Sequence, residues 1–113
     1  MVIDNVLASS AVFGADQDTG TVPADPGEEV ACLFRNVATI LELAGGTVDD
    51  IIRMDVFIRE NAIREFINRE WLRSYPDEAD RPARHITVNA NLPAQAQIEV
   101  LAVLQATNAQ VTR

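Results

Sequence analysis

The 113-residue chain contains no lysine, one cysteine and one histidine. Proteins that bind DNA or RNA neutralise phosphates with clustered basic residues, whereas this chain has nine scattered arginines and a net charge of −8. The composition therefore argues against a nucleic-acid partner. A single cysteine excludes a disulfide within the chain and favours a reducing compartment. One cysteine and one histidine are also too few for a structural zinc site, so no metal is expected.

Long apolar segments are missing as well. No apolar run approaches the roughly 20 residues that a membrane-spanning helix needs. The amino terminus lacks the basic region and apolar segment of a secretory signal. We therefore expect no membrane partner and a cytoplasmic location. The length fits one domain over residues 1–113, with the polar residues 107–113 as a frayed tail.

The clearest pattern in the chain is an amphipathic helix that begins at Pro26. Asp25 can cap this helix, and proline suits its first position. Gly45 and Gly46 supply the stop. Cys32 lies between apolar neighbours, so we interpret it as a buried thiol that packs rather than reacts. The apolar residues recur every three or four positions and form one stripe: Val30, Leu33, Phe34, Val37, Ile40, Leu41 and Ala44.

The remaining regular segments are four strands and a second helix. Alternating apolar residues or short apolar runs predict the strands, and apolar residues at helical spacing predict the helix, which Pro76 ends. The strands are expected at 6–13, 52–58, 85–90 and 97–104, and the helix at 61–74. This order predicts a two-layer α+β domain in which a mixed sheet carries two helices on one face.

The last predicted strand is apolar on both faces. Ile98 and Val100 point to one side, whereas Leu101 and Val103 point to the other. Two helices can cover only one face of the sheet. We therefore expect the second face to meet another copy of the same chain.

Glu99 is the most informative single residue. It lies between Ile98 and Val100 in an otherwise apolar strand, where a carboxylate costs free energy unless it is paired or used. A carboxylate in that position suits proton transfer. The alternative is a carboxylate near the end of the strand that faces solvent.

Arg84 is the second candidate, because it starts an apolar strand. Its guanidinium could hold a substrate carboxylate through two parallel hydrogen bonds, or it could serve in a surface ion pair. His85 should point away from Arg84 and into solvent. On the second helix, Asn68 lies among polar residues, and Trp71 is interpreted as part of the core.

Several segments in order resemble the RidA (YjgF/YER057c/UK114) family, also known as the L-PSP endoribonuclease family. The most specific match is Pro82-Ala83-Arg84, with Leu92-Pro93 eight residues after the arginine and Glu99 six residues after that proline. The likeness extends from about Val6 to Ala106 and includes the segments 36–46, 48–58 and 66–71.

The resemblance implies a chorismate mutase-like α+β fold that assembles as a homotrimer, with clefts between neighbouring subunits. It implies a deaminase that hydrolyses 2-aminoacrylate and 2-iminoacids to 2-oxoacids and ammonia, without a metal or organic cofactor. The arginine that matches Arg84 holds the substrate carboxylate, and the glutamate that matches Glu99 activates water. Backbone groups near Ile86, the side chain of Asn68 and the segment around Ser10 would line the cleft.

The chain departs from the family at some of these positions. The family's Ser-Gly-Gln reads Ser9-Ser10-Ala11, its cysteine two positions after the arginine is Ile86, and a common second glutamate is Leu101. The family's lid tyrosine has no counterpart, since Tyr75 lies elsewhere. One alternative is thus a non-catalytic trimer that binds small carboxylates. Endoribonuclease activity is the other, and the net charge of −8 argues against it.

Overall fold

The structure of the protein is a computed structural model that describes residues 1–104. The predicted frayed tail at 107–113 lies outside these residues. The helices and longer strands are α1 (Pro26–Leu43), β4 (Ile51–Ile58), α2 (Arg64–Ser74), β5 (Ala83–Val88) and β6 (Ala96–Val103). Three short strands precede them: β1 (Val2–Ile3), β2 (Val6–Ala8) and β3 (Val12–Phe13).

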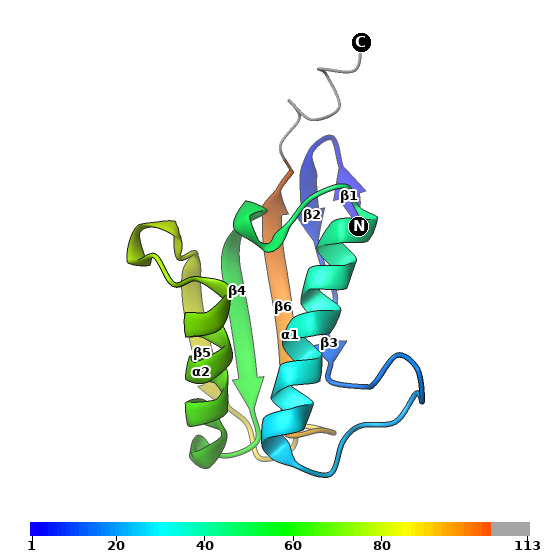
Figure 1. Ribbon diagram of the computed structural model, residues 1–113, viewed down its shortest axis with the longest axis vertical. Coiled ribbons are helices and arrows are strands. Elements are labelled where there is room, and N and C mark those ends of the chain that lie inside the picture. Colours follow the sequence, from blue (N-terminus) through cyan, green and yellow to red (C-terminus); the bar gives the residue numbers. More distant parts are fainter. Residues whose placement is uncertain (105–113) are drawn as a thin grey trace.

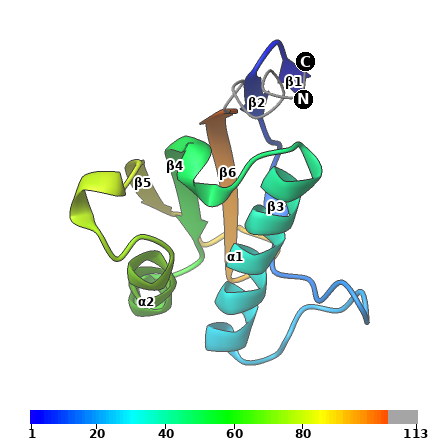
Figure 2. The same ribbon diagram turned by 45° about the horizontal axis from the view of Figure 1, so that its top comes forward.

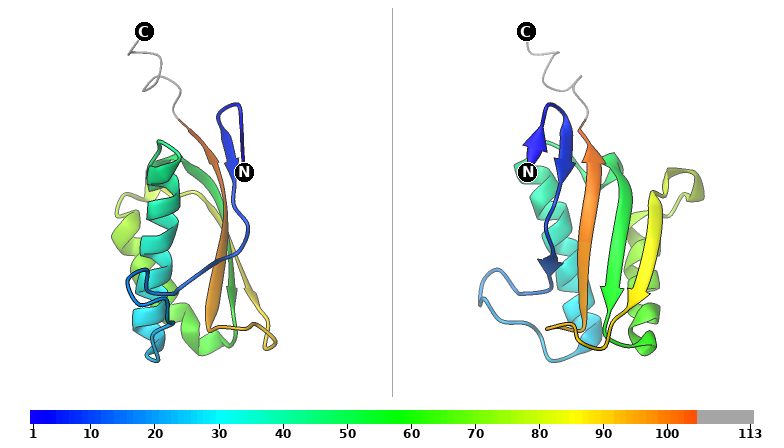
Figure 3. Two further views of the ribbon diagram at one scale, coloured as in Figure 1. Left: turned by 90° about the vertical axis from the view of Figure 1, so that its right-hand side faces the viewer. Right: turned by 180° about the vertical axis from the view of Figure 1, so that it is seen from behind.

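The strands form one mixed sheet with the order β1-β2-β6-β4-β5, and β3 also pairs with β6. The β4–β5 pair is parallel, whereas all other pairs are antiparallel. Figure 1 shows α1 in front of β6 and α2 in front of β5, and the turned view in Figure 2 shows both helices on the same side of the sheet. Seen from behind, the sheet is covered by neither α1 nor α2 (Figure 3). The predicted two-layer α+β fold with both helices on one face is confirmed.

Helix α1 forms as its sequence predicts. The Asp25 carboxylate accepts a hydrogen bond of 3.1 Å from the Glu28 backbone amide, and Pro26 occupies the first turn. Gly45 closes the helix with a φ of 89°, a conformation that glycine adopts at little cost. Cys32 is buried, as expected. In the described part of the chain, neither helix has the length and apolar character of a membrane span.

The core lies between the helices and the sheet, and Leu33 is fully buried at its centre. We expect Leu33→Ala to lower the free energy of unfolding by about 2–5 kcal/mol, because the truncation leaves a cavity. Leu43, 84% exposed on the same helix, provides the matched control. Urea unfolding should show that Leu43→Ala lowers the free energy of unfolding by less than about 0.5 kcal/mol. Equal losses in the two variants would contradict this packing.

Four details of the strands differ from the predictions. The predicted strand at 6–13 is broken into β2 and β3, and the β1–β2 hairpin was missed because β1 has only two residues. The pairing of β4 with β6 shifts between Ile51 and Arg53, so the alternation that predicted this strand fails at Ile52, which is 49% exposed. Strand β5 covers 83–88 rather than 85–90, because its pairing with β4 begins at Ala83 and ends at Val88.

Glu29 is a buried carboxylate on α1 that holds the connection between β5 and β6. It accepts a hydrogen bond of 2.9 Å from the Gln95 backbone amide. Arg59 supports the same connection by donating to the Leu92 carbonyl at 3.0 and 3.3 Å. Burial raises the pKa of Glu29 above its ordinary 4.5, although hydrogen bonds from the backbone of Gln95 and Ala96 and the charge of Arg59 oppose the shift.

The raised pKa of Glu29 predicts a pH-dependent stability. The folded state holds this proton more tightly than the unfolded state, so the resulting stabilisation is complete below the unfolded pKa. This stabilisation is lost as the pH rises through the pKa of Glu29 in the folded state. Glu29→Gln keeps an acceptor for Gln95 and removes the charge. We expect the variant to gain stability relative to wild type as the pH rises from about 4 to about 8. Urea unfolding at both pH values tests this, with exposed Glu28→Gln as control, and a pH-independent difference would contradict it.

Candidate carboxylate-binding site

Arg84 lies on the helix-covered side of β5. It pairs with Met54 of β4, which is buried under the helices, so both side chains point toward the helix layer. Arg84 Nη1 donates a hydrogen bond of 3.0 Å to Asn68 Oδ1, and the Arg84 Cζ lies 4.8 Å from the centre of the Trp71 ring. Asn68 and Trp71 are one turn apart on α2. The helix therefore presents an amide and an aromatic face to one guanidinium.

Ile86 completes this group on the same side of β5. It is partly buried against the core and pairs with Val56 of β4. Because β5 is the last strand of the sheet, its outer edge offers unpaired backbone donors and acceptors. Three predicted substrate-binding residues, Arg84, Asn68 and Ile86, thus lie at one edge of the molecule.

The environment of Arg84 is positive and partly buried. Burial lowers the pKa of Arg84, and the charges of Arg64 and Arg81 lower it further. Within residues 1–104, Arg84 makes no ion pair. The bond to Asn68 uses one of its five donors. A partly buried cation without a carboxylate partner favours an anionic ligand. The planar guanidinium has two parallel N–H donors that match the two oxygens of a carboxylate.

Glu99 lies on the opposite face of the sheet. It pairs with Asp55 of β4, and Asp55 pairs with His85 of β5. The residues on either side of Glu99, Ile98 and Val100, are buried beneath the helices. The Glu99 side chain therefore projects from the bare face, where it is half-buried. His85 is exposed on this face, which confirms its predicted orientation away from Arg84.

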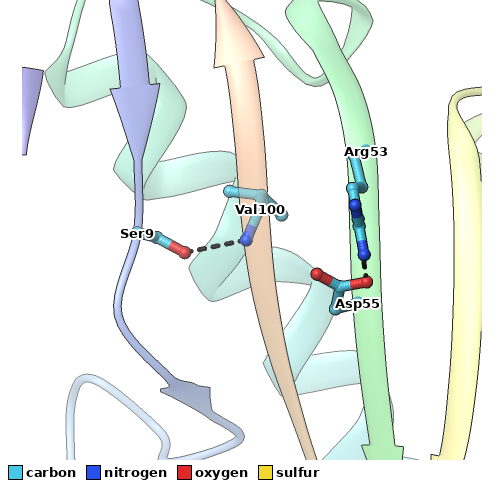
Figure 4. A network of polar contacts seen from close by, with 4 residues as sticks. All are labelled: Ser9, Arg53, Asp55 and Val100. Atoms are coloured by element: carbon cyan, nitrogen blue, oxygen red, sulfur yellow. Dashed lines mark hydrogen bonds and ion pairs between the residues drawn. The ribbon is translucent and has the colours of Figure 1, made fainter.

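The segment Ser9–Ala11 interrupts the pairing beside Glu99. Ala8 pairs with Leu101 and Val12 with Ile98, so three residues stand opposite Glu99 and Val100. Ser9 bridges the interruption, because its Oγ accepts a hydrogen bond of 2.9 Å from the Val100 amide (Figure 4). Ser10 is exposed in this bulge. The structure therefore brings Ser10 near Glu99, and not near Arg84.

A single chain does not bring Arg84 and Glu99 together, since they project from opposite faces of the sheet. Two surface hollows of the described chain lie elsewhere. One of about 290 Å³ is lined by α1 and residues 16–18, and one of about 270 Å³ lies mainly between α1 and α2. Neither is lined by Arg84 or Glu99. A site that uses both residues must draw them from two copies of the chain.

Three functional or structural residues escaped the sequence reasoning. Asp55 stands opposite Glu99 in the sheet. Arg53 forms an ion pair with Asp55 at 3.1 Å. Glu29 was missed although it lies four residues before Leu33 and thus on the apolar stripe of α1. An acid at a core-facing helical position was the available signal. For Asp55 no such signal exists without the strand register.

Comparisons with known proteins give one consistent result. The profile of the family described as Endoribonuclease L-PSP matches residues 1–106. The 2-iminobutanoate/2-iminopropanoate deaminase of Escherichia coli K12 is 29% identical over 102 residues, which are 89% of this chain and 80% of the relative.

Solved structures show the same fold. The YjgF gene product from E. coli has a TM-score of 0.83 and 28% identity, over 93% of this chain and 85% of that one. E. coli TdcF with bound serine has a TM-score of 0.81 and 27% identity, over the same shares of the two chains. The matched range contains all helices and strands of the described chain, so the protein belongs to the RidA family, also called the endoribonuclease L-PSP family.

Proposed function

We propose that the protein hydrolyses reactive enamines and imines, converting 2-aminoacrylate and 2-iminoacids to 2-oxoacids and ammonia. The observation that carries the proposal is the state of Arg84. Its guanidinium is oriented by Asn68 and Trp71, partly buried, and without an ion-pair partner in residues 1–104. Such a group favours a small molecule with a carboxylate. Ile86, Asn68 and Ser10 would line the remainder of the cleft.

The proposed active unit is a homotrimer. Arg84 lies near the outer edge of the sheet at β5, and Glu99 lies on the face that neither α1 nor α2 covers. A cleft that uses both forms where the edge of one copy meets the bare face of the next. Leu101 and Val103 on that face supply apolar surface for such a contact.

The proposed reaction needs fixed positive charge and one proton-transfer group. Arg84 holds the substrate carboxylate, which places the C=N carbon near Glu99 of the neighbouring copy. Glu99 takes a proton from water as the oxygen adds to that carbon. Glu99 then returns this proton to the nitrogen, the C–N bond breaks, and the hydroxyl proton passes to the departing nitrogen, so that the carbonyl forms and ammonia leaves. An enamine first isomerises to the imine, and no further reactant is consumed.

The relatives support this proposal over ribonuclease activity. One relative is named for the deamination of 2-iminobutanoate and 2-iminopropanoate, and the TdcF structure contains serine, a small molecule with a carboxylate and an ammonium. RNA binding would need clustered positive charge, whereas this chain has a net charge of −8 and no lysine.

A trapping assay tests the proposal directly. A dehydratase generates 2-aminoacrylate from serine, and semicarbazide traps the resulting imine with and without the protein. We expect trapping to fall as the protein concentration rises, because hydrolysis competes with it. Trapping that stays constant at every concentration would exclude hydrolysis. Serine binding without any effect on trapping would instead identify a non-catalytic carboxylate-binding protein.

A further inference from the structure

The bare face of the sheet carries a row of titratable side chains that the proposed reaction does not fully use. Glu99 on β6, Asp55 on β4 and His85 on β5 stand in register across three neighbouring strands. Side chains that stand directly opposite on antiparallel strands have their Cβ atoms about 5 Å apart. The two carboxylates therefore lie within reach of one small ligand group.

The Asp55 carboxylate is oriented rather than free to turn. Arg53 Nε donates to Asp55 Oδ1 at 3.1 Å, on the same face of β4. Figure 4 shows that the second oxygen of Asp55 points toward β6. Glu99 projects from β6 on this face, so that oxygen points toward the strand that carries Glu99.

The carboxylates of Asp55 and Glu99 together carry more negative charge than the neighbouring side chains balance. Like charges directly opposite on neighbouring strands are destabilising. Arg53 balances one of the two carboxylates, and the neighbours of Glu99 along β6 on this face, Gln97 and Leu101, carry no charge. One negative charge is thus left over where the next copy would cover the face. A ligand nitrogen with positive charge would complete the balance.

We propose that Asp55 is a specificity-determining residue of this site: its second oxygen and Glu99 together accept hydrogen bonds from the positively charged nitrogen of the substrate. The inference rests on the proposed function, in which Arg84 of another copy holds the carboxylate. A protonated imine has two N–H donors, one for each carboxylate. The ligand class is then a small 2-iminium or 2-ammonium carboxylate rather than any small carboxylate. Asp55 exchanges no proton and forms no covalent bond.

The experiment compares serine with glycerate, which has a hydroxyl in place of the ammonium and is otherwise the same. Calorimetry measures both dissociation constants for the wild type, for Asp55→Asn and for the control Glu42→Gln. Glu42 is exposed near the end of α1, and Glu42→Gln changes the net charge by the same amount as Asp55→Asn. Asparagine keeps the shape of Asp55, and loss of its exposed pair with Arg53 costs little stability.

We expect the wild type to bind serine more tightly than glycerate. Asp55→Asn should weaken serine binding by about tenfold, which is the effect of losing one charge-assisted hydrogen bond, and leave glycerate binding unchanged or tighter. Glu42→Gln should change neither. Equal weakening of both ligands by Asp55→Asn, or no weakening of serine, would overturn the inference and leave the proposed function standing. A wild type that binds neither ligand would overturn both.

Discussion

Replacing Arg84 with alanine is expected to remove detectable binding of small carboxylates and to lower kcat/KM for imine hydrolysis by about a hundredfold or more. The reason is the loss of two parallel charge-assisted hydrogen bonds, which together are worth about 3 kcal/mol or more in a partly buried site. About 2.7 kcal/mol corresponds to a factor of a hundred in rate. Calorimetry with pyruvate and the trapping assay measure the two quantities.

Two further variants show whether the effect belongs to the site. Arg84→Lys keeps the charge but not the planar fork, so its affinity should fall between wild type and Arg84→Ala. Arg73 is the matched control, since its side chain is 70% exposed and pairs only at 3.5 Å with Glu70. Arg73→Ala should leave binding and activity within about twofold of wild type. Full binding in Arg84→Ala would exclude Arg84 as the carboxylate anchor.

Arg84→Ala also removes the hydrogen bond to Asn68 and the contact with the Trp71 ring, so the thermal midpoint of the variant serves as a check on folding. A small carboxylate should raise the midpoint of the wild type and not that of Arg84→Ala, because a ligand stabilises only the state that binds it.

Glu99→Gln is expected to have the second large effect. Unlike Arg84→Ala, it should lower kcat and leave the binding of small carboxylates almost unchanged. It should lower kcat by about a hundredfold to ten-thousandfold, because the glutamine amide cannot take a proton from water. Binding of pyruvate should stay within about threefold of wild type, since a 2-oxoacid lacks the nitrogen that Glu99 and Asp55 would contact. Steady-state kinetics and calorimetry separate the two effects.

The position of Glu99 also gives this prediction a control. Gln97 lies on the same strand and face, two residues away. Gln97→Ala should change kcat by less than about threefold if the chemistry depends on the carboxylate rather than on the face as a whole. An unchanged kcat in Glu99→Gln would rule out Glu99 as the group that activates water.

The parts of the fold that depend on local patterns were predictable from the sequence. The cap at Asp25, the apolar stripe of α1 and the glycines after it are local signals, and the helix forms between them. The bare face of the sheet followed from counting two helices against a strand that is apolar on both sides. The bulges at Ile52 and at Ser9–Ala11 were not predictable, because one extra residue in a strand leaves no mark in composition.

The arrangement of the site depended on strand register, which the sequence does not contain. Alternation along β5 separated Arg84 from His85, and alternation along β6 separated Glu99 from Val100. Neither pattern says which side of one strand lies beside which side of the other. Only the pairing of Met54 with Arg84, and of Asp55 with Glu99, places the two candidate residues on opposite faces. The same pairing brings Asp55 into the candidate site.

Arg84 and Glu99 are proposed to act together across a boundary between two copies, and mixing two inactive variants tests this arrangement. Arg84→Ala and Glu99→Gln are each expected to be inactive alone. When they are unfolded together in equal amounts and refolded, about one quarter of the boundaries should combine an intact Arg84 with an intact Glu99. The mixture is therefore expected to recover about one quarter of wild-type activity. A mixture as inactive as its components, with mixed assemblies confirmed by mass spectrometry, would contradict it.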